Sequence, residues 1–523
     1  MRYGLFLSTA VALVTLGGIG IATGRPSDAT SAPSKADDRP NVIVIIADDL
    51  GYGDTGVYGS TLIKTPNIDA LAASGVRFTS GYVTHPVCAP SRAALVTGRY
   101  QQRFGFEFNP VGRDAASGVA LREVTIAQLM KKAGYRTGMV GKWHLGQARG
   151  YYPTDRGFDE YFGMASGGST YIVDPQPGDE FHSTAETEMS TSTDRLAGRA
   201  SAPAGQVGQR QRLLAARQRF PITRNGKIVD VPEYLTDAFT DEATRFIGRD
   251  SARPFFLYLA YTAPHTPLQA TKRYADRYAH IADPAKRVYA AMVSALDDGV
   301  GRVVAQVKAK GLERRTLIVF LSDNGCAGYL GAACSNGPLS GSKATPLEGG
   351  IRVPFIMAMP GRIAGGRVDA RTVSSLDVLP TALGLAAARA PSDRPYDGID
   401  LMPRLTTSVA TPARTLYWRA GAGHAVLRGH DKLVSLPLAP DGAKAGYVER
   451  EVDDTAATAP HVMLYDLSRD PGETRNRAAV DRRKAASLAR SYDIWAKALA
   501  PPAWPSRRVV YIDHDGHILD VRN

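Results

Sequence analysis

The sequence predicts an α/β protein in which helices cover both faces of a mostly parallel sheet and a smaller α+β domain follows. Two observations predict it. Apolar runs of strand length, such as "NVIVIIADD" and "TLIVFLSDNG", alternate with segments of helical period over residues 41–405. From about residue 412 the runs are shorter and typical of antiparallel strands. Strands joined by helices form right-handed crossovers, which place helices on both faces of a parallel sheet.

Local signals delimit the elements of the larger part in order. "TPNIDALAASG" begins a helix with Thr65 as N-cap and Pro66 at the first helical position, and the helix stops at Gly75. "TIAQLMKKAGY" predicts a second helix, and about residues 284–310 predict a long amphipathic one. "RTGMVGKWHLG" and "RPFFLYLAYTAPH" predict strands that lead into polar loops.

The remaining segments define the predicted domain organisation. "RTLYWRA", "AVLRGHDKLVSL" and "HVMLYDLSRDPGE" predict short antiparallel strands, and about residues 478–499 predict a last helix. Residues 175–230 are polar and poorly periodic, which is typical of a surface insertion near a pocket. We therefore predict a signal peptide and linker in residues 1–40, a main domain in 41–405, and an antiparallel sheet plus helix subdomain in 406–523.

The N-terminal segment predicts export. "MRYGLFLSTAVALVTLGGIGIATG" has a basic start, an apolar run and small residues, which are typical of a secretory signal peptide. We expect a periplasmic or extracellular protein with no stable membrane insertion after signal cleavage. An uncleaved N-terminal membrane anchor is the alternative, because the apolar run is nearly long enough to span a bilayer.

The distribution of charge argues against nucleic-acid binding. The 523 residues carry a net charge of +12, but the basic residues are scattered and form neither a block of five nor a nucleic-acid-binding motif. We therefore expect no nucleic acid as partner. A small anionic substrate remains compatible, since it needs only a few of these charges.

Four predicted strands end in side chains that can bind a metal or move a proton. Ligands of open parallel sheets bind beyond the carboxyl ends of the strands, so these side chains are expected to meet. They are Asp48 and Asp49, His144, His265, and Asp323 and Asn324. The aspartates and the asparagine supply oxygen donors, which suit a hard cation such as Ca²⁺ or Mg²⁺ better than zinc.

"HPVCAPSRAALVTGR" places a cysteine at the start of a predicted helix. Pro90 fits the first turn of this helix and Gly98 ends it. Cys88 thus lies at a helix N-terminus, where backbone N–H groups and the macrodipole favour negative charge. Arg92, one turn on, adds a fixed cation for an oxyanion.

The cysteine count leaves at least one of the three cysteines unpaired within the chain. Cys326 and Cys334 lie close together in "NGCAGYLGAACSNG", and a local disulfide between them is one interpretation. Metal binding by this pair is disfavoured, because no further cysteine or histidine lies at zinc spacing. If the two do pair, Cys88 is the cysteine left over.

Cys88-Ala-Pro-Ser91-Arg92 followed by "AALVTGR" resembles the signature of the type I (formylglycine-dependent) sulfatases. "GKWHLG", "APHTP", "LSDNG", "LEGGIRVPFI" and "LYDLSRDPGETRN" match the same family in order, and the resemblance covers roughly residues 41–490. The chain is similar to bacterial arylsulfatases and to N-acetylgalactosamine-6-sulfatase-like enzymes. The resemblance implies an alkaline-phosphatase-like sheet sandwiched by helices, with residues 41–405 as the sulfatase catalytic domain.

The resemblance also implies the cofactors. In that family the motif cysteine is oxidised to formylglycine (3-oxoalanine), an aldehyde that hydrates to a diol. Cys88 is then the target of a formylglycine-generating enzyme, which is an expected maturation partner. The implied metal is Ca²⁺, with Mg²⁺ as the alternative. Its implied ligands are Asp48, Asp49, Asp323, Asn324 and the formylglycine oxygen at Cys88.

Catalytic roles follow from the resemblance residue by residue. Arg92, Lys142 and Lys343 are expected to neutralise the sulfate oxygens. His265 and Lys343 are candidates to protonate the leaving alcohol. His144 would take a proton from the second hydroxyl of the diol, so that the aldehyde and free sulfate form.

Lys142 and His144 lie together in "GKWHLG", and both are expected to face the site where this strand ends. Ser169 in "ASGGSTY" is expected to contact the substrate or an active-site residue.

The resemblance implies a sulfuric ester hydrolase that releases inorganic sulfate from an organic sulfate monoester. The first expected substrate is a sulfated carbohydrate, and the second is a small sulfated molecule. Two alternatives remain at this point. One is a phosphonate monoester or phosphodiester hydrolase of the same superfamily, which would use similar cations. The other is a non-catalytic sulfated-glycan-binding protein, which would lack catalytic residues.

Overall fold

The computed structural model describes residues 38–110, 117–182, 209–407, 409, 413–449, 460–506 and 508–522. They belong to one compact unit, residues 37–523. The predicted signal peptide, and residues 183–208 of the predicted insertion, lie outside the described residues. No helix within the described ranges is both long and apolar enough to cross a membrane. The predicted domain boundary after residue 405 stays a prediction.

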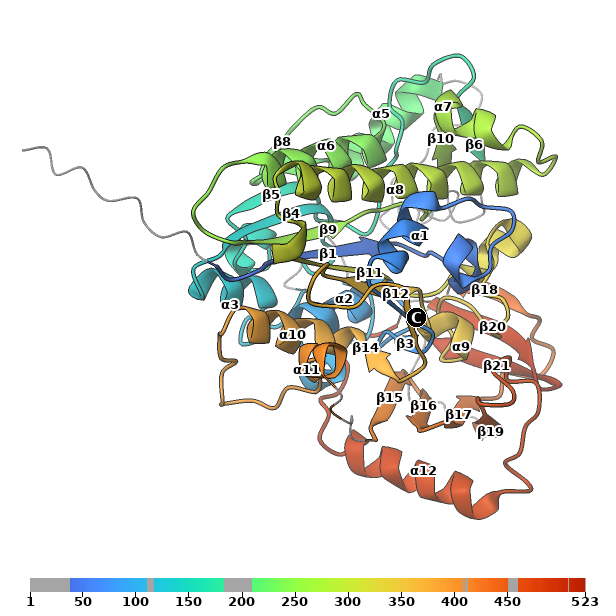
Figure 1. Ribbon diagram of the computed structural model, residues 1–523. Helices are drawn as coiled ribbons and strands as arrows, with labels where there is room; N and C mark the ends of the chain where they lie inside the picture. The colour runs from blue at the N-terminus through green and yellow to red at the C-terminus, as the bar shows by residue number, and fades with distance from the viewer. Residues whose placement is uncertain are drawn as a thin grey trace, which may run out of the picture. The chain divides into compact units, whose positions relative to one another are not determined.

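A ten-stranded sheet lies at the centre of the larger part (Figure 1). In spatial order its strands are β13 (Arg367–Asp369), β2 (Val76–Phe78), β12 (Phe355–Ala358), β11 (Thr316–Ser322), β1 (Asn41–Ala47), β9 (Phe255–Ala260), β4 (Arg136–Lys142), β5 (Glu160–Met164), β7 (Thr223–Arg224) and β8 (Lys227–Ile228). The central strands β11, β1, β9, β4 and β5 run parallel. Antiparallel pairs lie on both flanks. The predicted mostly parallel sheet is confirmed.

The central strands are apolar throughout because both faces of the sheet are covered. All seven residues of β1 are buried. Val42, Val44 and Ile46 belong to the core on one face, whereas Ile43 and Ile45 belong to the core on the other. One strand thus contributes alternate side chains to two separate cores.

Helices cover both faces of this sheet (Figure 1). On one face lie α1 (Pro66–Ala73), α6 (Leu235–Gly248) and α8 (Pro284–Ala309), and on the other lie α2 (Cys88–Thr97), α3 (Ile126–Lys132) and α10 (Val378–Leu385). Shorter or peripheral helices are α5 (Gln209–Arg219), α7 (Lys272–Ala275), α9 (Glu348–Ile351) and α11 (Met402–Thr406). Two short strand pairs are β6 (Glu180–His182) with β10 (Leu268–Ala270), and β3 (Gly81–Tyr82) with β14 (Val373–Ser374). The helices predicted in "TPNIDALAASG", in "TIAQLMKKAGY" and at about residues 284–310 are confirmed as α1, α3 and α8.

The C-terminal part contains the predicted antiparallel sheet. Its strands are β15 (Thr415–Ala420), β16 (Gly423–Arg428), β17 (Asp431–Pro437) and β19 (Pro460–Asp466). The helix α12 (Arg482–Ala496) packs on β16 and β17.

The predicted last helix is confirmed as the last helix of the described residues, but the prediction left out the strands that follow it. Two further strands follow it, β20 (Arg508–His514) and β21 (His517–Arg522), and they form a three-stranded sheet with β18 (Gly446–Glu449). Asp515 and Gly516 connect β20 to β21 with φ angles of 53° and 74°. Asp-Gly between two alternating runs is a strong hairpin signal, which the prediction left out.

A buried ion cluster joins the C-terminal sheet to the larger part. The Nζ of Lys432, in β17, lies 2.9 Å from Glu348 Oε1 and 2.8 Å from Glu473 Oε1. The other oxygen of Glu473 accepts a hydrogen bond from the backbone N–H of Glu348 at 2.7 Å. Since all three side chains are buried, each carboxylate depends on a protein cation rather than on water for its stability.

Candidate active site

The carboxyl ends of β1 and β11 bring four acidic or amide side chains together. Ala47 pairs with Ser322 in register, so the next residues of both strands lie at one edge of the sheet. The backbone N–H of Asp49 donates to Asp323 Oδ1 at 3.3 Å, and Asn324 Nδ2 donates to Asp49 Oδ1 at 2.7 Å. Asp48, Asp49, Asp323 and Asn324 are all buried.

This cluster fits a hard metal ion. Three donor atoms lie within 4.8 Å of one another in the group Asp48, Cys88 and Asp323, and likewise in the group Asp48, Asp49 and His265. The Oδ1 atoms of Asp48 and Asn324 are buried and have no hydrogen-bond partner. A buried oxygen without a donor is costly, and a cation would satisfy both atoms. The residues present therefore could hold Ca²⁺ or Mg²⁺.

Cys88 is the first residue of α2 and lies at the same edge. The helix ends at Gly98, whose φ of 65° is left-handed, as the sequence predicted. The Sγ of Cys88 lies 3.4 Å from His144 Nδ1 and 3.8 Å from Asn109 Oδ1. Burial raises the pKa of the thiol, so an unmodified Cys88 would stay protonated and be a poor thiolate nucleophile.

Three buried cations face the carboxylates. Arg92 donates to Asp323 Oδ2 at 2.7 Å. Lys142 Nζ donates to Asp48 Oδ2 at 2.7 Å, and Lys343 Nζ donates to Asp49 Oδ2 at 2.8 Å. The cluster thus combines positive and negative charge in an interior where water does not screen either.

The cluster shifts the pKa values of two carboxyl groups in opposite directions. Burial acts to raise the pKa of Asp49, but Lys343 and His265 outweigh it and hold that pKa below its usual range. Burial and the neighbouring Asp48 raise the pKa of Asp323 to about 6. Perturbed groups of this kind concentrate at functional sites.

Two histidines border the cluster. His265 Nε2 lies 3.7 Å from Asp49 Oδ2, and its Nδ1 lies 2.7 Å from the carbonyl oxygen of Thr266. Because a carbonyl oxygen only accepts, Nδ1 carries the proton of the neutral ring and Nε2 faces Asp49. Burial, with Lys142 and Arg92 nearby, lowers the pKa of His144 well below its usual value, so its ring is neutral.

The backbone takes a left-handed conformation at three non-glycine residues in or beside the site. Asp49, His144 and Ala344 have φ angles of 62°, 60° and 75°. Such conformations cost free energy and collect at functional sites. The strand β4 ends at Lys142, whose Nζ reaches Asp48, and His144 follows in a left-handed turn with its Nδ1 near Cys88. Both side chains thus lie at the site.

Two residues near the site, Asn109 and Tyr329, were not predicted from the sequence, whereas Ser169 was. Asn109, beside Cys88, lies in no quoted motif, and Tyr329, whose hydroxyl lies 3.4 Å from Asp49 Oδ2, lies in "NGCAGYLGAACSNG", where only the cysteines were given a role. Ser169 is buried and donates its hydroxyl to the carbonyl of Phe220 at 2.9 Å. Its predicted contact with substrate stays a prediction.

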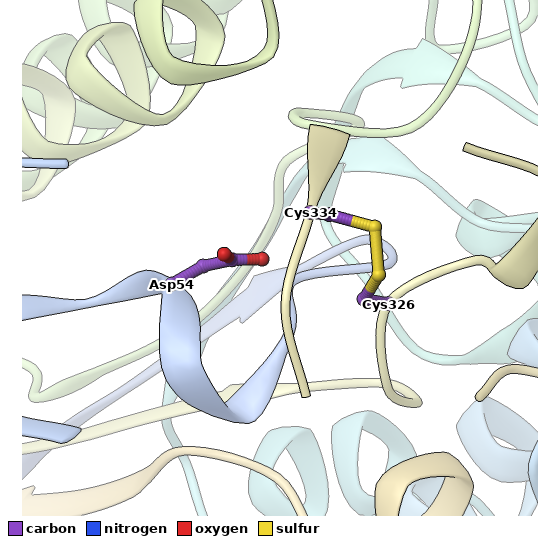
Figure 2. A group of neighbouring side chains, drawn as sticks. All are labelled: Asp54, Cys326 and Cys334. Carbon is purple, nitrogen blue, oxygen red and sulfur yellow. A yellow bond between two sulfur atoms is a disulfide. The ribbon is translucent and has the colours of Figure 1, made fainter. Parts of the chain in front are cut away.

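A third group is Asp54 with Cys326 and Cys334 (Figure 2), and the hydroxyl of Tyr289 connects Asp54 to the backbone carbonyl of Asp49. The two cysteines form a disulfide, so their sulfurs are not thiolate ligands and Cys88 is the free cysteine of the chain. The carboxylate of Asp54 accepts hydrogen bonds from the hydroxyl of Tyr289 at 2.7 Å and from the backbone N–H of Ser335 at 3.0 Å.

Asp54 leads to a prediction about pH. Burial raises its pKa from 3.8 to about 6, so between these values the native protein binds more protons than the unfolded chain. The free energy of unfolding therefore falls as pH rises through this range, by about 3 kcal/mol from this group. Asp54→Asn cannot ionise and is expected to flatten the decrease, which urea unfolding at a series of pH values measures. An unchanged slope in the variant would contradict the assignment.

Residues 40–388 match the sequence profile of the Sulfatase family. The chain is 34% identical over 459 residues to the N-acetylgalactosamine-6-sulfatase of Mus musculus, which covers 83% of this chain and 81% of the mouse protein. It is 34% identical over 532 residues to the steryl-sulfatase of Mus musculus, which covers 90% of this chain and 82% of that protein. The crystal structure of Ps i-CgsB in complex with k-i-k-neocarrahexaose is similar with a TM-score of 0.73 and 32% identity, over 89% of this chain and 94% of that one.

The chain belongs to the sulfatase family. It is an enzyme of that family, a sulfatase with an alkaline-phosphatase-like sheet and a small C-terminal sheet domain. The predicted family, fold class and enzyme class are confirmed.

Proposed function

We propose that this sulfatase hydrolyses a sulfate monoester of a carbohydrate, with Cys88 converted to formylglycine and with Ca²⁺ in the cluster of Asp48, Asp49, Asp323 and Asn324. The observation that carries the proposal is the place of Cys88. It is a buried, unpaired cysteine at a helix N-terminus, and it lies among three carboxylates, three cations and two histidines. The proposal includes an exported protein and a formylglycine-generating enzyme that matures it.

The two cofactors would supply the nucleophile and the Lewis acid: a hydrated aldehyde provides an attacking hydroxyl, and a divalent metal activates it and polarises the sulfate. Asp48, Asp49, Asp323 and Asn324 would hold the metal with their oxygen atoms. The unpartnered oxygens of Asp48 and Asn324 support this set.

Arg92, Lys142 and Lys343 would stabilise the charge that builds on the sulfate oxygens. Their side chains are nearly inaccessible to solvent, so they need little reorganisation when charge develops. Arg92 is also fixed by a hydrogen bond from its NH1 to the backbone carbonyl of Lys142 at 2.9 Å.

The two histidines would move protons. His265, with Lys343 beside it, would act as the imidazolium and protonate the leaving alcohol from Nε2, while the Thr266 carbonyl holds the proton on Nδ1. His144 is neutral, and its Nδ1 faces the side chain of residue 88, so it can accept a proton there.

The substrate class rests on the relatives. One is a sulfatase of an amino sugar by its name, and the structure of Ps i-CgsB was determined with a neocarrahexaose bound. Both support a sulfated carbohydrate for this chain. The assay is release of inorganic sulfate from a panel of sulfated oligosaccharides, run beside a matched aryl phosphonate monoester and an aryl phosphodiester. Faster turnover of a phosphorus ester would overturn the proposal in favour of the related hydrolase.

Gly167 offers a test of the role of His144. A Cβ at Gly167 would lie 2.7 Å from His144 Nε2, whereas a Cβ at Gly168 would lie 4.0 Å from the nearest atom of His265. Gly167→Ala is expected to displace the His144 ring and lower kcat about ten- to hundred-fold. Gly168→Ala is the matched control, with kcat within about two-fold of the parent because its contact is ordinary. Equal effects of the two variants would count against the role of His144.

A further inference from the structure

A loop closed by the disulfide Cys326–Cys334 lies directly beyond Asn324 (Figure 2). Its backbone is fixed from two sides. Cys326 donates its N–H to Asn336 Oδ1 at 2.9 Å and accepts from the backbone N–H of Lys343 at 2.9 Å. The residue after Cys334 donates to the Asp54 carboxylate. The disulfide loop is thus bonded to the segment that carries Lys343.

Tyr329 lies within this loop, in the 3₁₀ helix η7 (Gly328–Ala333). Leu330 and Ala333 point into the core below, and Tyr329 is half-buried. Its hydroxyl lies 3.4 Å from Asp49 Oδ2 and 3.5 Å from Thr266 Oγ1, and its ring centroid lies 5.9 Å from Lys343 Nζ. The ring thus packs partly on the apolar core and is partly exposed beside the buried charges of Asp49 and Lys343.

The charged residues of the site recognise a sulfate group whatever molecule bears it. Discrimination needs a contact with the rest of the substrate, and a half-buried aromatic ring beside Lys343 can provide one. The face of an aromatic ring carries partial negative charge, and it packs well against apolar C–H groups that carry partial positive charge. The C–H face of a sugar ring next to the sulfate has this character.

We propose that Tyr329 positions the substrate by packing its ring against the sugar that bears the sulfate, and that the Cys326–Cys334 disulfide holds Tyr329 there. This rests on the proposed function, because it takes the sulfate to lie at Lys343. Tyr329 then determines specificity for the carbohydrate, while Arg92, Lys142 and Lys343 bind the sulfate.

The test compares Tyr329→Ala, Tyr329→Phe and the control Tyr492→Ala, which removes a half-buried ring that stacks on His424 at 3.8 Å in the C-terminal part. The measurements are kcat and KM for the sulfated oligosaccharide that the parent enzyme hydrolyses fastest, and Ki for inorganic sulfate. Tyr329→Ala is expected to raise KM about ten-fold, as expected for one lost ring contact, and to leave the Ki of sulfate within about two-fold. Tyr329→Phe keeps the ring and is expected to restore KM.

The possible outcomes separate the two proposals. A parent enzyme that releases no sulfate from any sulfated oligosaccharide overturns the proposed function. A parent enzyme that is active, with the same KM in Tyr329→Ala, overturns only the role of Tyr329. An equal rise in KM and in the Ki of sulfate also overturns it, because the loss would then lie in the sulfate site.

The role of the disulfide is tested by Cys326→Ser combined with Cys334→Ser. This variant is expected to raise KM and to lower kcat, since Lys343 is bonded to the Cys326 carbonyl. Adding Tyr329→Ala in this background is expected to raise KM by less than about two-fold further, because the ring is already displaced. A full second ten-fold rise would show that the disulfide does not position Tyr329.

Discussion

Cys88→Ala is expected to abolish sulfate release, with a loss in kcat of at least about 10⁴-fold. Alanine has neither an oxygen for the metal nor a group that can attack sulfur. The substitution removes one buried sulfur atom at the start of α2, so the protein is expected to stay folded. Assays of kcat beside a thermal unfolding curve separate the two effects. Unchanged activity in this variant would contradict the mechanism outright.

The modification itself is checked by the mass of the peptide that spans residues 85–99 of the active enzyme. Conversion of the cysteine to formylglycine is expected to lower the peptide mass by about 18 Da. An unmodified thiol in fully active enzyme would exclude formylglycine as the nucleophile.

Removal of the metal is expected to have the second-largest effect. Dialysis against EDTA should lower kcat about 10³-fold or more, and Ca²⁺ should restore it, because the metal is proposed to activate the nucleophile and polarise the sulfate. Asp48 Oδ1 and Asn324 Oδ1, which have no hydrogen-bond partner, are the proposed ligands. Asp48→Asn keeps the size of the side chain and removes its charge. It is expected to weaken metal binding and to lose activity that added Ca²⁺ does not recover.

Asp297→Asn is the matched control for the metal experiment. Asp297 is equally buried, but its carboxylate accepts hydrogen bonds from the backbone N–H groups of Asn67 and Ile68 at the start of α1. It is expected to lower stability and to leave the Ca²⁺ dependence of kcat unchanged. If EDTA-treated parent enzyme keeps its activity, the acidic cluster does not hold a catalytic metal.

Much of the site could be predicted because its residues follow strand ends. Asp48 follows β1 and Asp323 follows β11, and two parallel neighbours in register bring such residues together in any sheet of this type. The burial of both faces of β1 is likewise visible as an uninterrupted apolar run. These predictions need only local pattern and general topology.

Other parts of the site depend on tertiary structure. Asn109 reaches the site from a loop with no pattern of its own, and the segment between Cys326 and Cys334 does not mark Tyr329 as a site residue. The left-handed turn at His144 is uncommon for a residue other than glycine. The predicted contact of Ser169 with the substrate or an active-site residue stays a prediction, and in the structure its hydroxyl donates to the carbonyl of Phe220. A sequence does not reveal which way a loop side chain turns.

The sharing of Lys432 by Glu348 and Glu473 has a consequence for protein engineering. Glu348 belongs to the segment just after Lys343, whereas Lys432 and Glu473 come from the C-terminal sheet and the loop after it. A chimera that takes its C-terminal part from another sulfatase must supply the lysine wherever it supplies the glutamate. A donor with the glutamate alone would bury two carboxylates without the lysine between them, at a cost of about 3–5 kcal/mol. Compatibility between the two halves of such a hybrid therefore depends on this buried ion cluster as well as on the active site.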